Sequence, residues 1–239
     1  MDPVLEKRDD AARVNTATLY GLMAQSKTYP DRIELGRGDP DLDTPPHIVA
    51  AVTRAMHKAP VGHYPVEGML SLRQAIARRL YDVNGIEVDP EKEVVVTNGG
   101  QEAVFTMVQA VLRPGDEILV PDPNYNTYRD AIRFARAERV SVPTFVEQSF
   151  RVEPEHMRAA ITERTRAMLL VSPNNPSGAV INPQDVRALA EIARAHDLII
   201  LADDIYDRYL YDGAQHLSPA ALPGVKERTL TLNAVSKQY

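Results

Sequence analysis

The 239-residue chain is 44% hydrophobic and 25% charged, a composition typical of a globular protein that buries a sizeable core. Its 27 basic and 33 acidic residues give a formal net charge of −6, which favours neither nucleic acid nor a membrane surface as a partner. Without cysteine, the chain has no disulfide, thiolate nucleophile or cysteine-ligated metal. The charged first ten residues and the lack of a long apolar run predict a cytoplasmic protein.

The first part of the chain predicts an arm followed by two helices. Residues 1–46 show little periodicity and contain the turn-rich stretch LGRGDPDLDTPP, so we expect an N-terminal arm or connecting segment there. From His47 onward a helix is indicated by apolar residues that recur about every 3.6 positions, namely Ile48, Val52, Ala55 and Met56. A second helix has its apolar positions at Leu72, Ile76 and Leu80. We expect the arginines of this helix largely on its solvent side, namely Arg73, Arg78 and Arg79.

From residue 94 onward, short apolar runs alternate with helical patterns. The apolar runs predict six strands, at residues 94–97, 117–120, 139–142, 167–171, 198–202 and 229–235. The patterns between them predict helices, at residues 104–111, 126–135 and 154–161 and from 183 onward. Because strands that are apolar on both faces alternate with helices, we predict an α/β fold whose mostly parallel sheet is covered by helices on both faces.

Residues able to do chemistry follow most of these strands. In an open parallel sheet a ligand binds beyond the carboxyl ends of the strands. The candidates at that edge, in chain order, are Gly99, Gly100, Gln101, Tyr125, Asn175, Asp203, Tyr206, Ser236 and Lys237. The pair of glycines before a predicted helix is suited to an anion, because backbone N–H groups can approach it and the start of a helix favours negative charge.

Each of these positions also has an ordinary structural explanation. Gly-Gly, Asn-Pro and Ser-Gly are common turn formers, and a tyrosine on a proline-rich loop normally packs against its neighbours. An aspartate at a strand end can cap a helix, and a lysine at a strand end normally reaches solvent. Single positions therefore decide nothing, whereas their order along one shared sheet edge points to a ligand site.

Taken together, these residues resemble a fold-type I, class I/II aminotransferase that depends on pyridoxal 5'-phosphate. The resemblance runs from LGRGDPDLDTPP through GHYPVEGMLSLRQAIA, TNGGQEAV, RPGDEILVPDPNYNTY, SPNNPSGAVI and LADDIYDRYLY to NAVSKQY. It implies transfer of an amino group between an L-amino acid and a 2-oxo acid. It also implies that residues 47–239 form the cofactor-binding large domain, and that residues 1–46 are an arm and a segment of the small domain.

The resemblance implies three catalytic residues. Lys237 would form the Schiff base with the cofactor and move a proton at the substrate. Asp203 would pair with the pyridine nitrogen of the cofactor and keep it protonated, so that the ring withdraws electrons. Tyr206, together with Asn175, would hydrogen-bond the 3-oxygen of the cofactor and keep the pKa of the lysine imine low.

The resemblance also implies the remaining contacts of the cofactor and substrate. Tyr125 would stack on the cofactor ring, and Ser236 would lie in the cofactor site. The helix start would bind the phosphate through Gly99, Gly100 and Gln101. Tyr64 would reach the phosphate of a neighbouring subunit, so a homodimer is implied. Gly38 and Asn175 would contact the substrate.

The chain departs from the family pattern at two places. Position 234 is alanine where many relatives carry a phosphate-binding serine, and Ser236, two residues further on, is not an equivalent of that serine in the family pattern. The family continues past the lysine with a further strand of the sheet and a C-terminal domain, which supply arginines for the phosphate and for the substrate carboxylate. We therefore expect the 239 residues to be C-terminally incomplete and inactive alone, and the amino acid substrate stays open.

Three other functions stay open beside the aminotransferase. The first is a carbon–sulfur lyase or a related enzyme that uses the same cofactor, lysine and aspartate. The others are a sensor domain, as in transcription regulators that contain an aminotransferase-like domain, and an inactive fragment. The six histidines show no metal-ligand spacing, so we predict no metal site and expect them at the surface or at helix ends, namely His47, His57, His63, His156, His196 and His216.

Overall fold

The computed structural model describes residues 19–33, 42–58 and 63–238. The chain divides into two units, residues 1–43 and 44–239. Within the described part of the first unit, helix α2 spans Leu19–Ser26, inside the segment expected to be an arm. The domain boundary expected after residue 46 stays a prediction.

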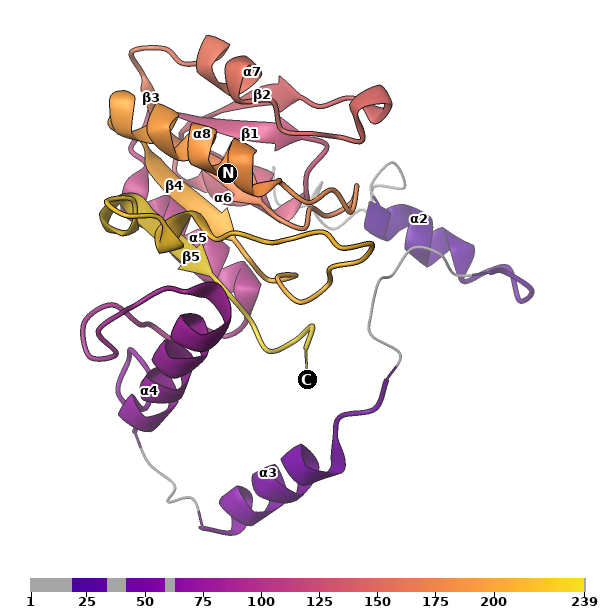
Figure 1. The fold of residues 1–239 in the computed structure, drawn as a ribbon. Helices are drawn as coiled ribbons and strands as arrows, with labels where there is room; N and C mark the ends of the chain where they lie inside the picture. The colour runs from indigo at the N-terminus through magenta and orange to yellow at the C-terminus, as the bar shows by residue number, and fades with distance from the viewer. Residues whose placement is uncertain (1–18, 34–41, 59–62, 239) are drawn as a thin grey trace, which may run out of the picture. The chain divides into compact units, whose positions relative to one another are not determined.

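The second unit contains a sheet of five strands that are all parallel, in the order β2–β1–β3–β4–β5 (Figure 1). The strands are β1 Glu117–Asp122, β2 Glu138–Pro143, β3 Thr165–Val171, β4 Ile199–Asp203 and β5 Thr229–Leu232. Five of the six predicted strands are therefore confirmed, although β5 ends earlier than expected.

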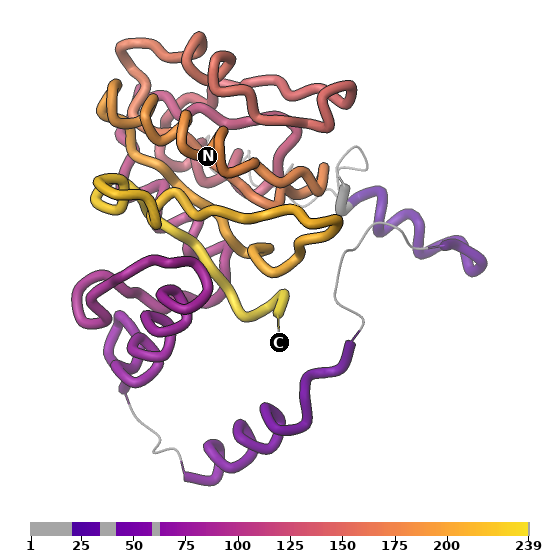
Figure 2. Tube along the Cα trace, viewed as in Figure 1, coloured from indigo at the N-terminus to yellow at the C-terminus, as the bar shows by residue number. Residues whose placement is uncertain are grey.

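Helices connect and precede these strands, as the trace in Figure 2 shows. The α-helices of the second unit are α3 Pro46–Lys58, α4 Leu70–Arg79, α5 Gly100–Val111, α6 Thr127–Phe134, α7 Pro154–Ala159 and α8 Pro183–Ala195. The shorter turns of helix are η2 Leu80–Asn84, η3 Val146–Gln148, η4 Pro219–Ala221 and η5 Lys226–Arg228. The helix expected from His47 is confirmed as α3, but none of its residues is buried.

The two faces of the sheet are packed against different helices. Along β3, Met168 and Leu170 join a buried cluster with side chains of α7 and α8. The alternate residues Ala167, Leu169 and Val171 join a second cluster with side chains of α5 and α6. Because successive side chains of a strand point to opposite faces, a run that is apolar at every position needs a cover on both. The predicted α/β fold is confirmed (Figure 1).

The strand order places a switch point at the middle of the sheet. From β1 the chain crosses to β2 on one side and then returns to β3 on the other side. The loops that leave the carboxyl ends of β1 and β3 therefore separate, which is where ligands bind in open α/β sheets. At this point the side-chain amide of Asn174, after β3, donates to the carbonyl of Pro123, after β1, at 3.1 Å.

The strand predicted at residues 94–97 is wrong. The segment is irregular, and Val96 donates its N–H to the carbonyl of Glu67 at 2.9 Å. A β-branched run becomes a strand only where a neighbouring strand takes up its backbone groups. Within the described ranges no strand pairs with this run, although Val94 is buried.

The expected exposure of Arg73 is also wrong. Its side chain is buried, and its guanidinium donates to the carbonyls of Gly68, Pro90 and Glu91 at 3.0, 2.7 and 3.0 Å. A guanidinium has five N–H donors and can satisfy several backbone carbonyls at once. Arg73 therefore joins the loop before α4 to the loop that follows η2, a role that a helical pattern cannot indicate.

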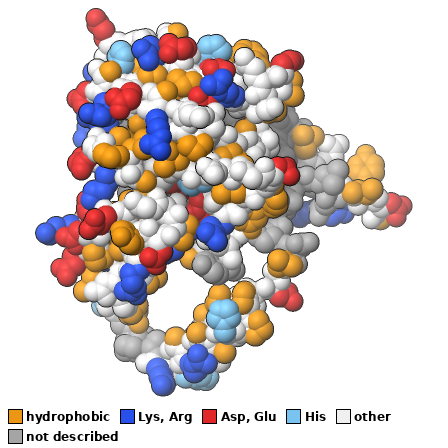
Figure 3. Space-filling model, viewed as in Figure 1, with side chains coloured by type: hydrophobic (Ala, Val, Ile, Leu, Met, Phe, Trp, Pro, Cys, Tyr) orange, Lys and Arg blue, Asp and Glu red, His pale blue; other side chains and the backbone are white. Residues whose placement is uncertain are grey.

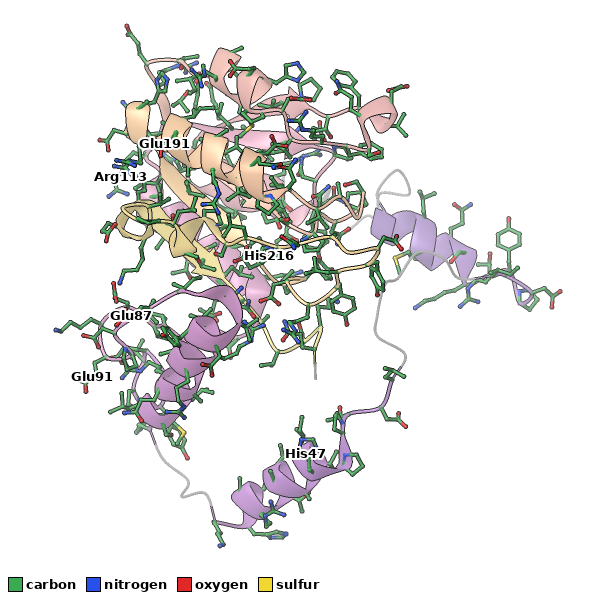
Figure 4. The ribbon with its side chains drawn as sticks, in the orientation of Figure 1. His47, Glu87, Glu91, Arg113, Glu191 and His216 are labelled. Atoms are coloured by element: carbon green, nitrogen blue, oxygen red, sulfur yellow. The ribbon has the colours of Figure 1, made fainter. Side chains whose placement is uncertain are left out.

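The surface of the molecule mixes charge signs. On the face drawn in Figure 3, acidic and basic side chains are interspersed with apolar ones. Glu191 of α8 points away from the sheet (Figure 4).

Among the helices that the structure describes, none is both long enough and apolar enough to cross a membrane.

Arg73→Lys should destabilise the fold although it keeps the charge. A lysine cannot hold three carbonyls in the planar fork of a guanidinium, so at least one of these partly buried hydrogen bonds is lost, at a cost of about 1 kcal/mol or more. Arg78→Lys, at an exposed position of the same helix, is the matched control and should change the free energy of unfolding by less than about 0.5 kcal/mol. Urea unfolding followed by circular dichroism measures both. Equal losses for the two variants would contradict the role assigned to Arg73.

Candidate active site

Asp203 lies at the carboxyl edge of the sheet, at the end of an interior strand. It is the last residue of β4, and the register pairs it with Val171 of β3 on one side and with Leu232 of β5 on the other. The loop after β3 contains Asn175, and the segment after β5 contains Lys237. The parallel register therefore brings three predicted site segments to the same edge of the sheet.

The carboxylate of Asp203 is buried and has polar partners but no cation. The residue is 6% exposed. Its Oδ2 accepts a hydrogen bond from the hydroxyl of Tyr128 at 2.7 Å, and its Oδ1 accepts one from the N–H of Ile205 at 3.1 Å. Among the residues that the structure describes, no lysine or arginine forms an ion pair with it. Burial raises the pKa of Asp203 above its ordinary value of 3.8.

Tyr128 is a site residue that sequence reasoning missed. It lies on α6, is buried, and its ring meets that of Tyr125 edge to face, with ring centroids 6.1 Å apart. Burial and the neighbouring Asp203 carboxylate raise the pKa of Tyr128 far above its usual range, so the hydroxyl keeps the proton that it donates. The spacing YNTY could have indicated it, because residues three apart at a helix start lie on one side.

The side chains of Tyr206 and Asn175 lie close to one another. Burial raises the pKa of Tyr206, and a hydrogen bond from the side chain of Asn175 opposes part of that rise. Tyr206 follows β4 and Asn175 follows β3, so the contact joins two neighbouring strand ends. The amide of Gln101, on α5, lies 3.4 Å from the hydroxyl of Tyr125. The aromatic and amide candidates therefore form one group around the end of β4.

The start of α5 has the geometry of an anion-binding helix end. Gly99 precedes the helix with a φ of 82°, in the left-handed region that glycine tolerates. A side chain at Gly100 would meet Ile205 Cδ1 at 3.6 Å and Leu232 Cδ2 at 3.7 Å, so this helix start packs close to the ends of β4 and β5. The first N–H groups of a helix have no partner inside the helix and carry partial positive charge.

Lys237 lies in a turn beyond β5. The N–H of Gln238 donates to the carbonyl of Val235 at 3.1 Å, which places Ser236 and Lys237 in the middle of the turn. Lys237 is partly buried and Ser236 is exposed. The carbonyl of Lys237 accepts a hydrogen bond from the hydroxyl of Tyr209, which follows β4. Lys237 is thus held beside the loop that begins at Asp203.

Two further candidates are Tyr64 and Gly38. Tyr64 is half exposed in the segment before α4, which is compatible with a role at a neighbouring subunit. Gly38 lies outside the described residues, so its expected contact with the substrate stays a prediction.

His216 is not at the surface, which corrects the expectation for this residue. Its side chain is 7% exposed in the connection between β4 and β5 (Figure 4), and its Nε2 lies 3.4 Å from Oδ2 of Asp204. Burial lowers the pKa of His216, but the carboxylates of Asp204 and Asp207 outweigh that effect and raise the pKa overall. Sequence reasoning missed this residue because a lone histidine in an irregular connection has no periodicity that would indicate burial.

The site residues fit a ligand with a cationic nitrogen and a phosphate. Asp203 is a buried carboxylate that no cation among the described residues pairs with, and burial of a carboxylate is costly unless a positive charge joins it. The start of α5 lies close by, with N–H groups suited to an anion. Across the described part of the chain, no group of three or more histidine, aspartate or glutamate residues could hold a metal ion.

Comparison with known proteins identifies the family that the sequence resembles, and the match extends over most of the chain. The model of the family described as aminotransferase class I and II matches residues 30–239. A probable aspartate/prephenate aminotransferase from Thermus aquaticus is 43% identical over 209 residues, which are 87% of this chain and 54% of the relative. An arginine–pyruvate transaminase from Pseudomonas aeruginosa is 43% identical over 220 residues, which are 92% of this chain and 56% of the relative.

Comparison with solved structures also finds a close match over most of the chain. A structure described as Pyrococcus protein-A1 superposes with a TM-score of 0.91 at 38% identity, covering 96% of this chain and 59% of that one. The chain thus spans about half the length of the curated relatives that it matches.

Asp203→Asn should stabilise the ligand-free chain in a pH-dependent way. The folded chain keeps the Asp203 proton to higher pH than the unfolded chain, whose carboxyl ionises near 3.8. The free energy of unfolding therefore falls as the pH rises above 3.8. The loss is complete once the Asp203 carboxyl is ionised in the folded chain as well. At pH 7 the variant should melt about 2–4 °C higher if about 1 kcal/mol is regained. Thermal unfolding at pH 4 and pH 7 should show the smaller gain at pH 4. Equal gains at both pH values would be the opposing outcome.

Tyr128→Phe should have the opposite effect on stability. Loss of the hydroxyl removes a hydrogen bond to a buried carboxylate, which is worth about 1.5–3 kcal/mol. Tyr125→Phe is the matched control, because its hydroxyl has only the 3.4 Å contact with Gln101. Urea unfolding at pH 7 compares the free energies of unfolding of the two variants. A loss in Tyr125→Phe as large as that in Tyr128→Phe would disprove the special role of Tyr128.

Proposed function

The chain belongs to the class I and II aminotransferases, and we propose that it acts in the transfer of an amino group between an L-amino acid and a 2-oxo acid. Enzymes of this family use pyridoxal 5'-phosphate. The observation that carries the proposal is the buried carboxylate of Asp203, which has two hydrogen-bond donors and no cationic partner among the described residues.

Asp203 would bind the protonated ring nitrogen of the cofactor. An ionised carboxylate favours a cation beside it, and the cation in turn favours the ionised carboxylate, so each lowers the burial cost of the other. The hydroxyl of Tyr128 occupies Oδ2 and the N–H of Ile205 occupies Oδ1, so the carboxylate is already oriented. When bound, the cofactor supplies an electron-withdrawing ring and carries the amino group between the two substrates.

Lys237 would hold the cofactor through its amine and move a proton at the substrate Cα. Tyr206 and Asn175, which hydrogen-bond one another, would donate to the 3-oxygen of the cofactor. This contact would keep that oxygen ionised and the attached lysine nitrogen easier to deprotonate. Tyr125 would cover one face of the ring.

The start of α5 would hold the phosphate. Gly99, Gly100 and Gln101 supply backbone N–H groups at a helix end, and that end packs near Leu232. Ser236, exposed in the turn that contains Lys237, would add a hydroxyl to the phosphate site.

The substrates and the assembly belong to the same proposal. Gly38 and Asn175 would contact the substrate, and Tyr64 would complete the site of a second copy in a homodimer. The names of the two relatives refer to aspartate or prephenate and to arginine with pyruvate, so an amino acid and a 2-oxo acid are the substrate class. These names do not favour a lyase or a sensor. A cytoplasmic location stays a prediction.

The proposal predicts selective covalent labelling of Lys237. After incubation with pyridoxal 5'-phosphate and reduction with borohydride, the adduct should lie on the tryptic peptide 229–239, because trypsin does not cut after a modified lysine. Labelling of Lys237 should exceed that of Lys92, which is exposed, by about tenfold, corresponding to about 1.4 kcal/mol of added binding. Peptide mass spectrometry measures both sites.

Asp203→Asn is the second half of this test. The variant keeps Lys237 and the helix start but loses the charge that favours the protonated ring, so selectivity for Lys237 should fall towards that of Lys92. Labelling of Lys237 no greater than that of Lys92 in the parent chain would refute the proposed function.

A further inference from the structure

A third buried carboxylate, after those of Asp203 and Asp204, lies on the loop that begins at Asp203. Asp207 is 3% exposed. Its two oxygens accept hydrogen bonds of 2.7–3.1 Å from four side chains, namely Arg79, Asn84, Asn233 and Gln238. Asp203 has no cation among the described residues, whereas Asp207 has a guanidinium and three amides. Asp207 therefore needs no ligand to satisfy it.

Two of the donors to Asp207 lie on either side of Lys237 in the sequence. Asn233 comes directly after β5, and its Nδ2 lies 3.1 Å from Oδ2 of Asp207. Gln238 closes the turn, and its Nε2 lies 2.7 Å from Oδ1 of Asp207. The segment 233–238 is therefore tied at both ends to one carboxylate.

Arg79 hydrogen-bonds both Asp207 and Gln238, so the contacts form a closed network. Its Nη2 donates to both oxygens of Asp207 and to Oε1 of Gln238 at 3.0 Å, while Gln238 in turn donates to Asp207. Its Nη1 donates to Oδ1 of Asn84 at 2.8 Å. Arg79, which the sequence placed on the solvent side, is thus partly buried. Each amide of the network has only one orientation that satisfies its partners.

We propose that Asp207 is a positioning residue that holds the turn of Lys237 in place beside the end of β4. The proposal rests on the proposed function, because it is the cofactor that Lys237 must reach. A buried ion pair adds little net stability over apolar side chains of similar size, but a fully satisfied network can specify where a segment lies.

The position of Lys237 depends on such a network because, in the part of the chain that the structure describes, no sheet pairing extends to it. β5 ends at Leu232, and the last register pair is Asp203 with Leu232. A reactive group must stay within about 0.5 Å of its productive position, and irregular segments hold such positions less well than strands do. Asp207 supplies the restraint that the ladder of backbone hydrogen bonds would supply inside a strand.

Hydrogen exchange of the 239-residue chain without ligand tests the restraint. Asp207→Asn keeps the shape of the side chain and removes its charge and one acceptor oxygen, so the amides of 233–238 should exchange at least about tenfold faster. Asp185→Asn is the matched control, because Asp185 is equally buried and has bidentate contacts with Arg151 at 2.7 Å. This control should leave the exchange of 233–238 unchanged and increase exchange at the start of α8.

Gln238→Ala provides a test that does not disturb the buried ion pair. It removes one tie to the segment and leaves Asp207 paired with Arg79 and Asn84. Exchange in 233–238 should rise by about threefold or more, even if Asp207→Asn fails to fold. Exchange in this segment that stays as slow in Gln238→Ala as in Asp185→Asn would overturn the proposal.

The rate at which Lys237 is labelled tests whether the restraint on segment 233–238 affects the reactivity of this lysine. At equal pyridoxal 5'-phosphate, Asp207→Asn should form the borohydride-fixed adduct at Lys237 about tenfold more slowly than Asp185→Asn, while labelling of Lys92 stays the same in both. A purely structural role would slow the two variants alike and would overturn the proposal. If the parent chain shows no selective labelling, the proposed function fails, while faster exchange in Asp207→Asn would still support the restraint on the segment.

Discussion

A carboxylate buried at the end of a central strand is the constraint on which this site depends. Asp203 ends β4 between β3 and β5, where water is excluded and an ionised group is costly. The fold supplies the hydroxyl of Tyr128 and the N–H of Ile205 but no cation among the described residues. The remaining cost falls on the ligand-free state, and in our proposal a ligand with a cationic nitrogen removes it.

Asp203, at the end of β4, and Asp207, in the loop that follows, are buried carboxylates with opposite roles. Asp203 is oriented by neutral donors and faces the end of the sheet, whereas Asp207 is saturated by Arg79 and three amides. The first leaves a charge for a ligand, and the second uses its charge to organise the chain. Their closeness in sequence means that one short loop both receives the ligand and, in our proposal, positions the lysine that reacts with it.

The errors of sequence reasoning have a common physical origin. Arg73, His216 and the run at 94–97 are residues whose surroundings are set by segments distant in the sequence. A helical period marks which side of a helix is apolar, but it cannot show that loop carbonyls will surround an arginine on the other side. A β-branched run likewise indicates the capacity to form a strand, while pairing depends on a neighbouring strand.

The sequence by itself determined the α/β class, five of the strands and the residues at their ends, because periodicity and composition are local properties that survive without knowledge of the neighbours. It also carried the family resemblance that the comparisons confirm. Only the tertiary structure decided that Tyr128 donates to Asp203 and that Asp207 ties both flanks of Lys237. Such contacts join residues far apart along the chain, and the packing of the sheet and its helices alone sets their distances and burial.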